Sequence, residues 1–135
     1  MSLAELRGDV VILACAVSAG IHGALVPDHF DEGTGVGVAF VVAAALLAAL
    51  VVSLTQRPES ALALAASATV LLGLLAGYLL AVTTGLSVLH PEPEPVDGLA
   101  LATKAVEALG LLAASSLLWR PRVAATLFQL KGTLT

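Results

Sequence analysis

The sequence predicts an all-α integral membrane protein, a four-helix bundle whose transmembrane helices run up-down-up-down. Two observations predict this class. Hydrophobic residues make up 59% of the 135 residues and charged residues only 12%, whereas soluble domains are about 45–50% apolar and about 25% charged. The apolar residues also form four long runs separated by short polar segments. A soluble domain of this size would need more polar surface than these runs leave.

The four apolar runs define the expected spans within one transmembrane domain, residues 1–135. At a rise of about 1.5 Å per residue, each helical run covers the hydrocarbon core, which is about 30 Å thick. Pro27 is expected to close the first span, and the prolines of the HPEPEP segment exclude a helix between the third and the fourth. The WRPR segment is expected to end the last one. The spans are thus about 8–26, 36–54, 61–84 and 98–118, followed by a short cytoplasmic tail, 119–135.

The basic residues predict the orientation of the bundle. In a four-span layout, the connections on one side carry no Lys or Arg. Cytoplasmic loops of membrane proteins are enriched in these residues. The Ala-, Leu-, Val- and Gly-rich composition with few lysines is typical of bacterial chains. We therefore expect both termini in the cytoplasm, the acidic loops outside, and a location in the bacterial plasma (inner) membrane. The basic residues on the cytoplasmic side are Arg7, Arg57, Arg120, Arg122 and Lys131.

Composition and motifs exclude several classes of function. A single cysteine rules out an internal disulfide framework and a thiolate metal cluster. The net charge of −4, without a basic stripe, argues against nucleic-acid binding. The sequence contains no nucleotide-binding loop, nucleophile elbow or zincin motif. No catalytic residue is predicted, and enzymatic activity has no positive argument.

Lys104 and Glu107 are charged residues inside the fourth span. On the membrane-insertion scale, a charged side chain at a helix centre costs about 2.5–3.5 kcal/mol. Such groups face other helices, each other or water. With Asp97 and Ser115 they lie within an arc of about 80° on one side of the helix. Two interpretations stay open: an i,i+3 pair that neutralises itself inside the bundle, or a group that binds or relays a ligand.

The first span carries a matching polar stripe. Cys15, Ser18 and His22 fall within about 60° of one another on the helix. His22 also lies at a depth similar to that of Lys104 and Glu107. In an up-down bundle, the first and last helices usually pack together. The candidate ligand or ion site is therefore His22, Ser18, Lys104 and Glu107, although a hydrogen bond from His22 to Glu107 or Ser18 would need no ion.

All three histidines and most acidic residues fall toward the outer half of the predicted bundle. Imidazole and carboxylate groups together bind Zn²⁺, Cu²⁺, Fe²⁺ or Mn²⁺. The residue spacing matches no established metal motif, and acidic loops opposite the cytoplasm also follow from topology alone. A possible divalent metal ion is the one cofactor considered. Its candidate ligands are His22, His29, His90, Glu32 and Glu92.

Small residues indicate where helices approach closely. Gly20 and Gly23 precede Pro27 in the first span, and Gly73 and Gly77 form a small-xxx-small pair in the third. Such residues let the backbones of two membrane helices come together. We interpret all four glycines as packing positions, although the bare backbone at Gly20 and Gly23 also suits the approach of an ion or a small ligand.

Two classes of function remain. In the first, the chain is a structural or accessory membrane subunit with a polar, outward-facing pocket. In the second, it binds or transports a divalent cation or a proton, using the outer-half histidines and acids. Four short helices are few for a transporter acting alone. The expected partners are therefore the lipid bilayer and either further copies of the chain or a larger membrane complex.

Overall fold

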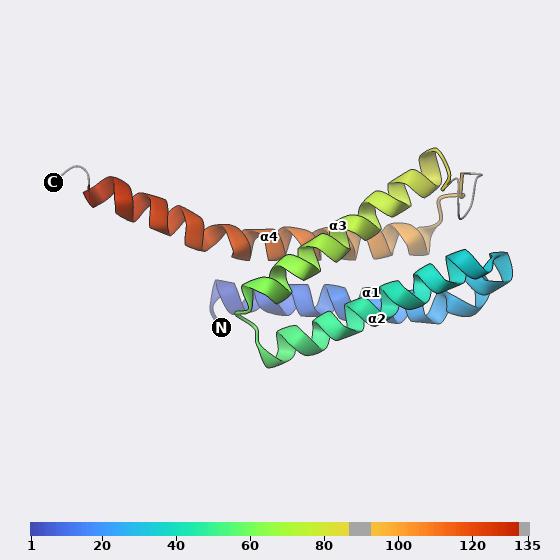
Figure 1. The fold of residues 1–135 in the computed structure, drawn as a ribbon, viewed down its shortest axis with the longest axis horizontal. Helices are drawn as coiled ribbons and strands as arrows, with labels where there is room; N and C mark the ends of the chain where they lie inside the picture. The colour runs from blue at the N-terminus through green and yellow to red at the C-terminus, as the bar shows by residue number, and fades with distance from the viewer. Residues whose placement is uncertain (87–92, 133–135) are drawn as a thin grey trace.

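The computed structural model describes residues 1–86 and 93–132, of which 120–132 are described as helical backbone. Within these ranges the chain forms four α-helices, and successive helices run in opposite directions (Figure 1). This confirms the expected all-helical fold. The helices are α1 (Leu3–Glu32), α2 (Thr34–Gln56), α3 (Ala61–Thr83) and α4 (Gly98–Gly132).

Each of the four helices is long and apolar enough to cross a membrane, α4 over Gly98–Trp119. Between 17% and 28% of the residues in each apolar stretch are buried inside the protein. Large apolar side chains therefore cover the outer surface. Exposing them to water would cost about 25 cal/mol per Å². This is the surface expected of a membrane protein. Among the most exposed of these side chains are Leu13, Leu62, Leu72, Leu112 and Trp119.

The first helix does not end at Pro27, as the sequence predicted, but continues to Glu32. Proline keeps a helical φ and removes only the hydrogen bond that its N–H would donate to the Gly23 carbonyl. Contacts with α2 hold the extra turn in place. The Phe30 ring packs on Gly37, where any added Cβ would overlap it. The backbone N–H of Gly33 then donates to the carbonyl of His29 at 3.1 Å and closes the helix.

The expectation that the WRPR segment ends the last helix is also wrong, because α4 continues to Gly132. Pro121 loses one hydrogen bond, but its fixed φ is compatible with the helix. The end of α4 therefore extends past the N-terminal end of α1 (Figure 1). The predicted tail, 119–135, is helical as far as the structure describes it.

Polar residues cap the N-terminal ends of α1, α3 and α4. The Ser2 hydroxyl accepts from the backbone N–H of Glu5, whose carboxylate accepts from the N–H of Ser2 in return, a capping box. The Ser60 hydroxyl accepts from the N–H of Ala63 at the start of α3. Asp97 accepts from the N–H of Ala100 at 2.8 Å at the start of α4. Each cap satisfies a backbone donor that the first helical turn leaves without a partner.

The helices do not pack evenly. α1 packs along α2 and also against α4, α3 packs against α4, and α2 and α3 contact each other much less. The expected contact between the first and last helices is thus confirmed. The two helices approach closely at Gly110 of α4, where an added Cβ would lie 2.5 Å from the Cβ of Ala14. We call the end with the N-terminus and the α2–α3 turn the proximal half. The end with the α1–α2 junction at Gly33 is the distal half.

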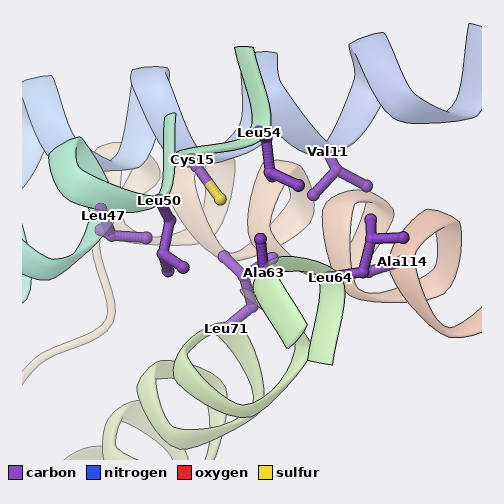
Figure 2. Close-up of a cluster of buried hydrophobic side chains, with 9 residues drawn as sticks. All are labelled: Val11, Cys15, Leu47, Leu50, Leu54, Ala63, Leu64, Leu71 and Ala114. Carbon is purple, nitrogen blue, oxygen red and sulfur yellow. The ribbon is translucent and has the colours of Figure 1, made fainter. Parts of the chain in front are cut away.

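The hydrophobic core lies in the proximal half (Figure 2). It joins the early turns of α1 and α3 to the last turns of α2, with Ala114 from α4. Its leucines fill the space between helices almost completely, and Leu47, Leu54 and Leu71 are at most 1% exposed. The core comprises Val11, Cys15, Leu47, Leu50, Leu54, Ala63, Leu64, Leu71 and Ala114.

Candidate functional site

The distal half encloses a cavity of about 480 Å³, lined by all four helices and by residues that precede α4. The cavity exists because α2 and α3 barely touch here and face it with small residues, among them Ala39, Ala43, Gly73 and Gly77. Most of its walls are apolar. Its ionisable lining residues are His22, His29, Glu32, Tyr78, Glu94, Asp97 and Lys104.

The glycines of α3 have a different role from the predicted one. A Cβ added at Gly73 or Gly77 would meet nothing within 4 Å, and both residues line the cavity. Within the chain, they therefore do not bring two helices together. Gly20 is likewise open, whereas Gly23 does face α2, with Ala44 at 4.0 Å from its added Cβ. Of the four predicted packing glycines, only Gly23 packs against another helix of this chain.

Below the cavity, a buried carboxylate joins α1 to α4. The Glu107 side chain is 0% exposed. Lys104 Nζ donates to Glu107 Oε2 at 2.7 Å, and Ser18 Oγ donates to Glu107 Oε1 at 2.6 Å. Both carboxylate oxygens are thus satisfied by short, charge-assisted hydrogen bonds. The i,i+3 pairing of Lys104 with Glu107 is therefore observed, and α1 supplies the third member.

His22 extends this network toward the cavity. Its Nδ1 lies 2.9 Å from the Ser18 carbonyl oxygen and 3.3 Å from Ser18 Oγ. A carbonyl oxygen only accepts, so Nδ1 carries the hydrogen, and Nε2 of the neutral ring keeps its lone pair. The four predicted residues thus form one continuous set: His22 contacts Ser18, Ser18 contacts Glu107, and Glu107 contacts Lys104. His22 thus makes the contact with Ser18 that the sequence left open.

His29 occupies the same side of α1, nearer the distal end. Its Nδ1 lies 2.9 Å from the Leu25 carbonyl oxygen, and its Nε2 lies 4.0 Å from a carboxylate oxygen of Glu32. The His29 ring stacks on Phe40 with centroids 3.5 Å apart, and the His22 ring lies 5.1 Å from the same phenyl ring. Both imidazoles line the cavity. His22 and His29 therefore lie on the same side of α1.

The predicted metal site is assembled only in part. Across residues 1–86 and 93–132, no three His, Cys, Asp or Glu side chains come together in a way that could hold a metal ion. The Phe40 ring contacts both His22 and His29. The other candidate ligands, His90 and Glu92, lie outside the described residues. The metal site predicted at His22, His29, His90, Glu32 and Glu92 as a whole remains a prediction.

Two aromatic residues of the site were missed by sequence reasoning. Phe40 of α2 contacts both histidines, and Tyr78 of α3 lies beneath Lys104, whose Nζ is 5.6 Å from the ring centroid. The Tyr78 hydroxyl is buried and has no hydrogen-bond partner in the described part of the chain. The available signal was weak: Tyr78 is the only tyrosine of the chain, in an otherwise apolar span.

No protein-family model, curated protein or solved structure matches this chain.

Proposed function

We propose that this protein is a small four-span accessory subunit of the bacterial plasma membrane, whose distal cavity binds a small ligand from outside the cell. It works with further copies of itself or within a larger membrane complex. The observation that carries the proposal is the division of the bundle, in which a cavity with a charged floor lies above a closely packed apolar core.

The exterior of the bundle supports the membrane part of the proposal. The apolar side chains of all four helices face outward, and the distal connections carry no Lys or Arg. The positive-inside rule then orients the proximal half toward the cytoplasm. The cavity, at the distal end, opens outward.

The interior of the bundle favours ligand binding in the cavity over ion transport through the chain. A path for an ion across the chain would have to continue from the cavity floor into the proximal half. There it meets the buried apolar side chains of Leu47, Leu54 and Leu71. A purely structural subunit, in turn, has no need of a buried ion pair, which costs several kcal/mol of desolvation per ion. The Ser18–Glu107–Lys104 network is placed where it orders the floor of a binding pocket.

Cysteine labelling in intact cells tests both parts of the proposal. In a Cys15→Ala background, single cysteines replace Thr34 at the distal end, Ala100 in the cavity wall, Gln56 at the proximal end and Ala63 in the core. A membrane-impermeant maleimide is expected to label the Thr34 and Ala100 positions. The Gln56 position reacts only after permeabilisation, and the Ala63 position stays unlabelled. Labelling of the Gln56 position but not the Thr34 position in intact cells would reverse the orientation. Labelling at Ala63 would instead favour a transport path through the chain.

A divalent cation is a second candidate for the ligand. In both His22 and His29, Nδ1 is held by the carbonyl four residues earlier, which leaves Nε2 available. Metal-binding histidines usually have their other ring nitrogen engaged in this way. Zinc binding is expected to weaken as the pH falls through about 6.5, because imidazole binds metal only when neutral. A His22→Ala, His29→Ala double variant should lose it, and unchanged zinc affinity in that variant removes this candidate.

A further inference from the structure

Building on the proposed ligand-binding cavity, we propose that its ligand is an amphipathic amine, with an ammonium group held at the rim and an apolar body in the interior. Three features of the cavity lead to this class of ligand. They are the sign of its charge, the character of its walls and its size.

The charge favours a cation. Three carboxylates, those of Glu32, Glu94 and Asp97, line the cavity together with one ammonium group, that of Lys104. Glu107 already balances Lys104 at 2.7 Å. The carboxylates therefore leave the cavity with surplus negative charge. An anionic ligand would be repelled by them and would have to compete with Glu107 for Lys104.

The carboxylates stand at the rim, not on the floor. Glu32 is the last residue of α1, and Asp97 precedes the first residue of α4. The side chain of Glu32 is 46% exposed. Lys104, seven residues beyond Asp97, lies about 10 Å further along the axis of α4. A cation held by the carboxylates therefore stays near water and away from Lys104.

The walls and the volume favour an organic body over a bare ion. Leu25, Val36, Leu74 and Leu99 line the interior, together with the ring of Phe40. A cavity of about 480 Å³ falls within the roughly 300–1,000 Å³ that small-molecule sites occupy. A metal ion would leave nearly all of this apolar surface uncovered.

Binding of three matched probes tests this assignment. Hexylamine, hexanol and hexanoate share one apolar chain and differ in charge, and the amine is protonated at neutral pH, as a lysine side chain is. Calorimetry is performed on the full chain in phosphatidylcholine nanodiscs, with empty nanodiscs to subtract partitioning into lipid. Hexylamine is expected to bind about ten-fold or more tightly than either other probe.

Charge variants locate the binding. The rim triple variant Glu32→Gln, Glu94→Gln, Asp97→Asn is expected to weaken hexylamine binding about ten-fold. The asparagine side chain introduced in place of Asp97 retains the ability to cap α4. The matched control removes three proximal carboxylates, by Glu5→Gln, Asp9→Asn and Glu59→Gln, and should leave the affinity unchanged. An equal loss in both triple variants means that net charge, not the rim, attracts the amine, and overturns the assignment.

The remaining outcomes separate this inference from the proposed function. Equal binding of hexylamine and hexanol, or zinc binding without hexylamine binding, overturns the amine and leaves the ligand-binding cavity in place. If neither zinc nor any of the three probes binds, and the cysteine that replaces Ala100 is also unlabelled, the cavity is closed and both proposals fail.

Discussion

The proximal and distal halves of the bundle are built from the same four helices and from similarly apolar sequence, yet the buried core lies in one and the cavity lined by all four helices lies in the other. In the proximal half, leucines from α2 and α3 meet Val11 and Cys15 of α1 (Figure 2). In the distal half, α2 and α3 turn small residues inward and leave a cavity between them. The spacing of α2 and α3, together with small residues at their facing positions, therefore distinguishes the pocket from the core in this chain.

The buried carboxylate lies between the two halves. Glu107 is completely buried, while its partner Lys104 still reaches the cavity with 15% of its side chain exposed. This asymmetry suggests that the two charges depend on each other unequally. Lys104 has access to the cavity if Glu107 is removed, whereas Glu107 has no comparable access if Lys104 is removed.

The largest expected effect comes from removing Lys104. Lys104→Met leaves a buried carboxylate without its cation, and breaking a buried pair costs about 3–5 kcal/mol. Glu107→Gln is expected to cost less, because Lys104 can turn into the cavity and the new amide oxygen can still accept from Ser18. Thermal stability in detergent measures both.

The double variant Lys104→Met, Glu107→Gln should recover most of the loss, because no buried charge remains. If the two single losses simply add, Lys104 and Glu107 do not interact. If Glu107→Gln is the more damaging single change, the inferred asymmetry between Lys104 and Glu107 is wrong.

The next prediction compares two leucines on one face of α3. Leu71 is 0% exposed in the core, and Leu74 lines the cavity. Leu71→Ala should lower stability by about 2–5 kcal/mol, because it creates a void in close-packed surroundings. Leu74→Ala enlarges a space that already exists and should cost about 1 kcal/mol. Equal losses measured by denaturant unfolding would show that the distal half is packed as closely as the proximal one.

These contrasts show what the sequence could and could not predict. The four helices follow from apolar runs, and the Lys104–Glu107 pair from i,i+3 spacing, since both depend on local periodicity. The contact between Ser18 and Glu107 also requires that α1 and α4 be adjacent, which the short connections of the chain favour.

Other features depend on neighbours that no local pattern reveals. Pro27 was expected to end α1, but contacts of Phe30 and His29 with α2 keep the helix going. Gly73 and Gly77 have the spacing of a packing motif yet face the cavity, whereas the same small-xxx-small spacing at Gly110 and Ala114 does pack against α1. The cavity itself results from helices that diverge.

A third prediction compares two fully buried serines. Ser18 Oγ donates to the Glu107 carboxylate across helices, whereas Ser67 Oγ donates to the Ala63 carbonyl of its own helix at 2.9 Å. Ser18→Ala should cost about 1.5–3 kcal/mol, the value of a hydrogen bond to a charged group. Ser67→Ala should cost less than about 0.5 kcal/mol, because the helix already satisfies that carbonyl. In a Glu107→Gln background the stability loss from Ser18→Ala should be smaller. An undiminished loss would show that Ser18 does not stabilise the protein through the Glu107 carboxylate.

The last prediction is the only one in which the effect on stability is expected to change sign between the two sites. Gly110→Ala places a methyl group 2.5 Å from the Cβ of Ala14 and 3.1 Å from a methyl carbon of Leu71, so α4 must move away from α1. Overpacking of this kind costs about 1–3 kcal/mol. Gly73→Ala adds the same methyl group to open space at the cavity wall, in a helix where alanine is favoured over glycine by about 0.5–1 kcal/mol. It should therefore leave stability unchanged or raise it. A thermal-unfolding comparison decides the point: if Gly73→Ala destabilises as much as Gly110→Ala, another helix occupies the distal space, and the cavity between α2 and α3 is not open in the membrane.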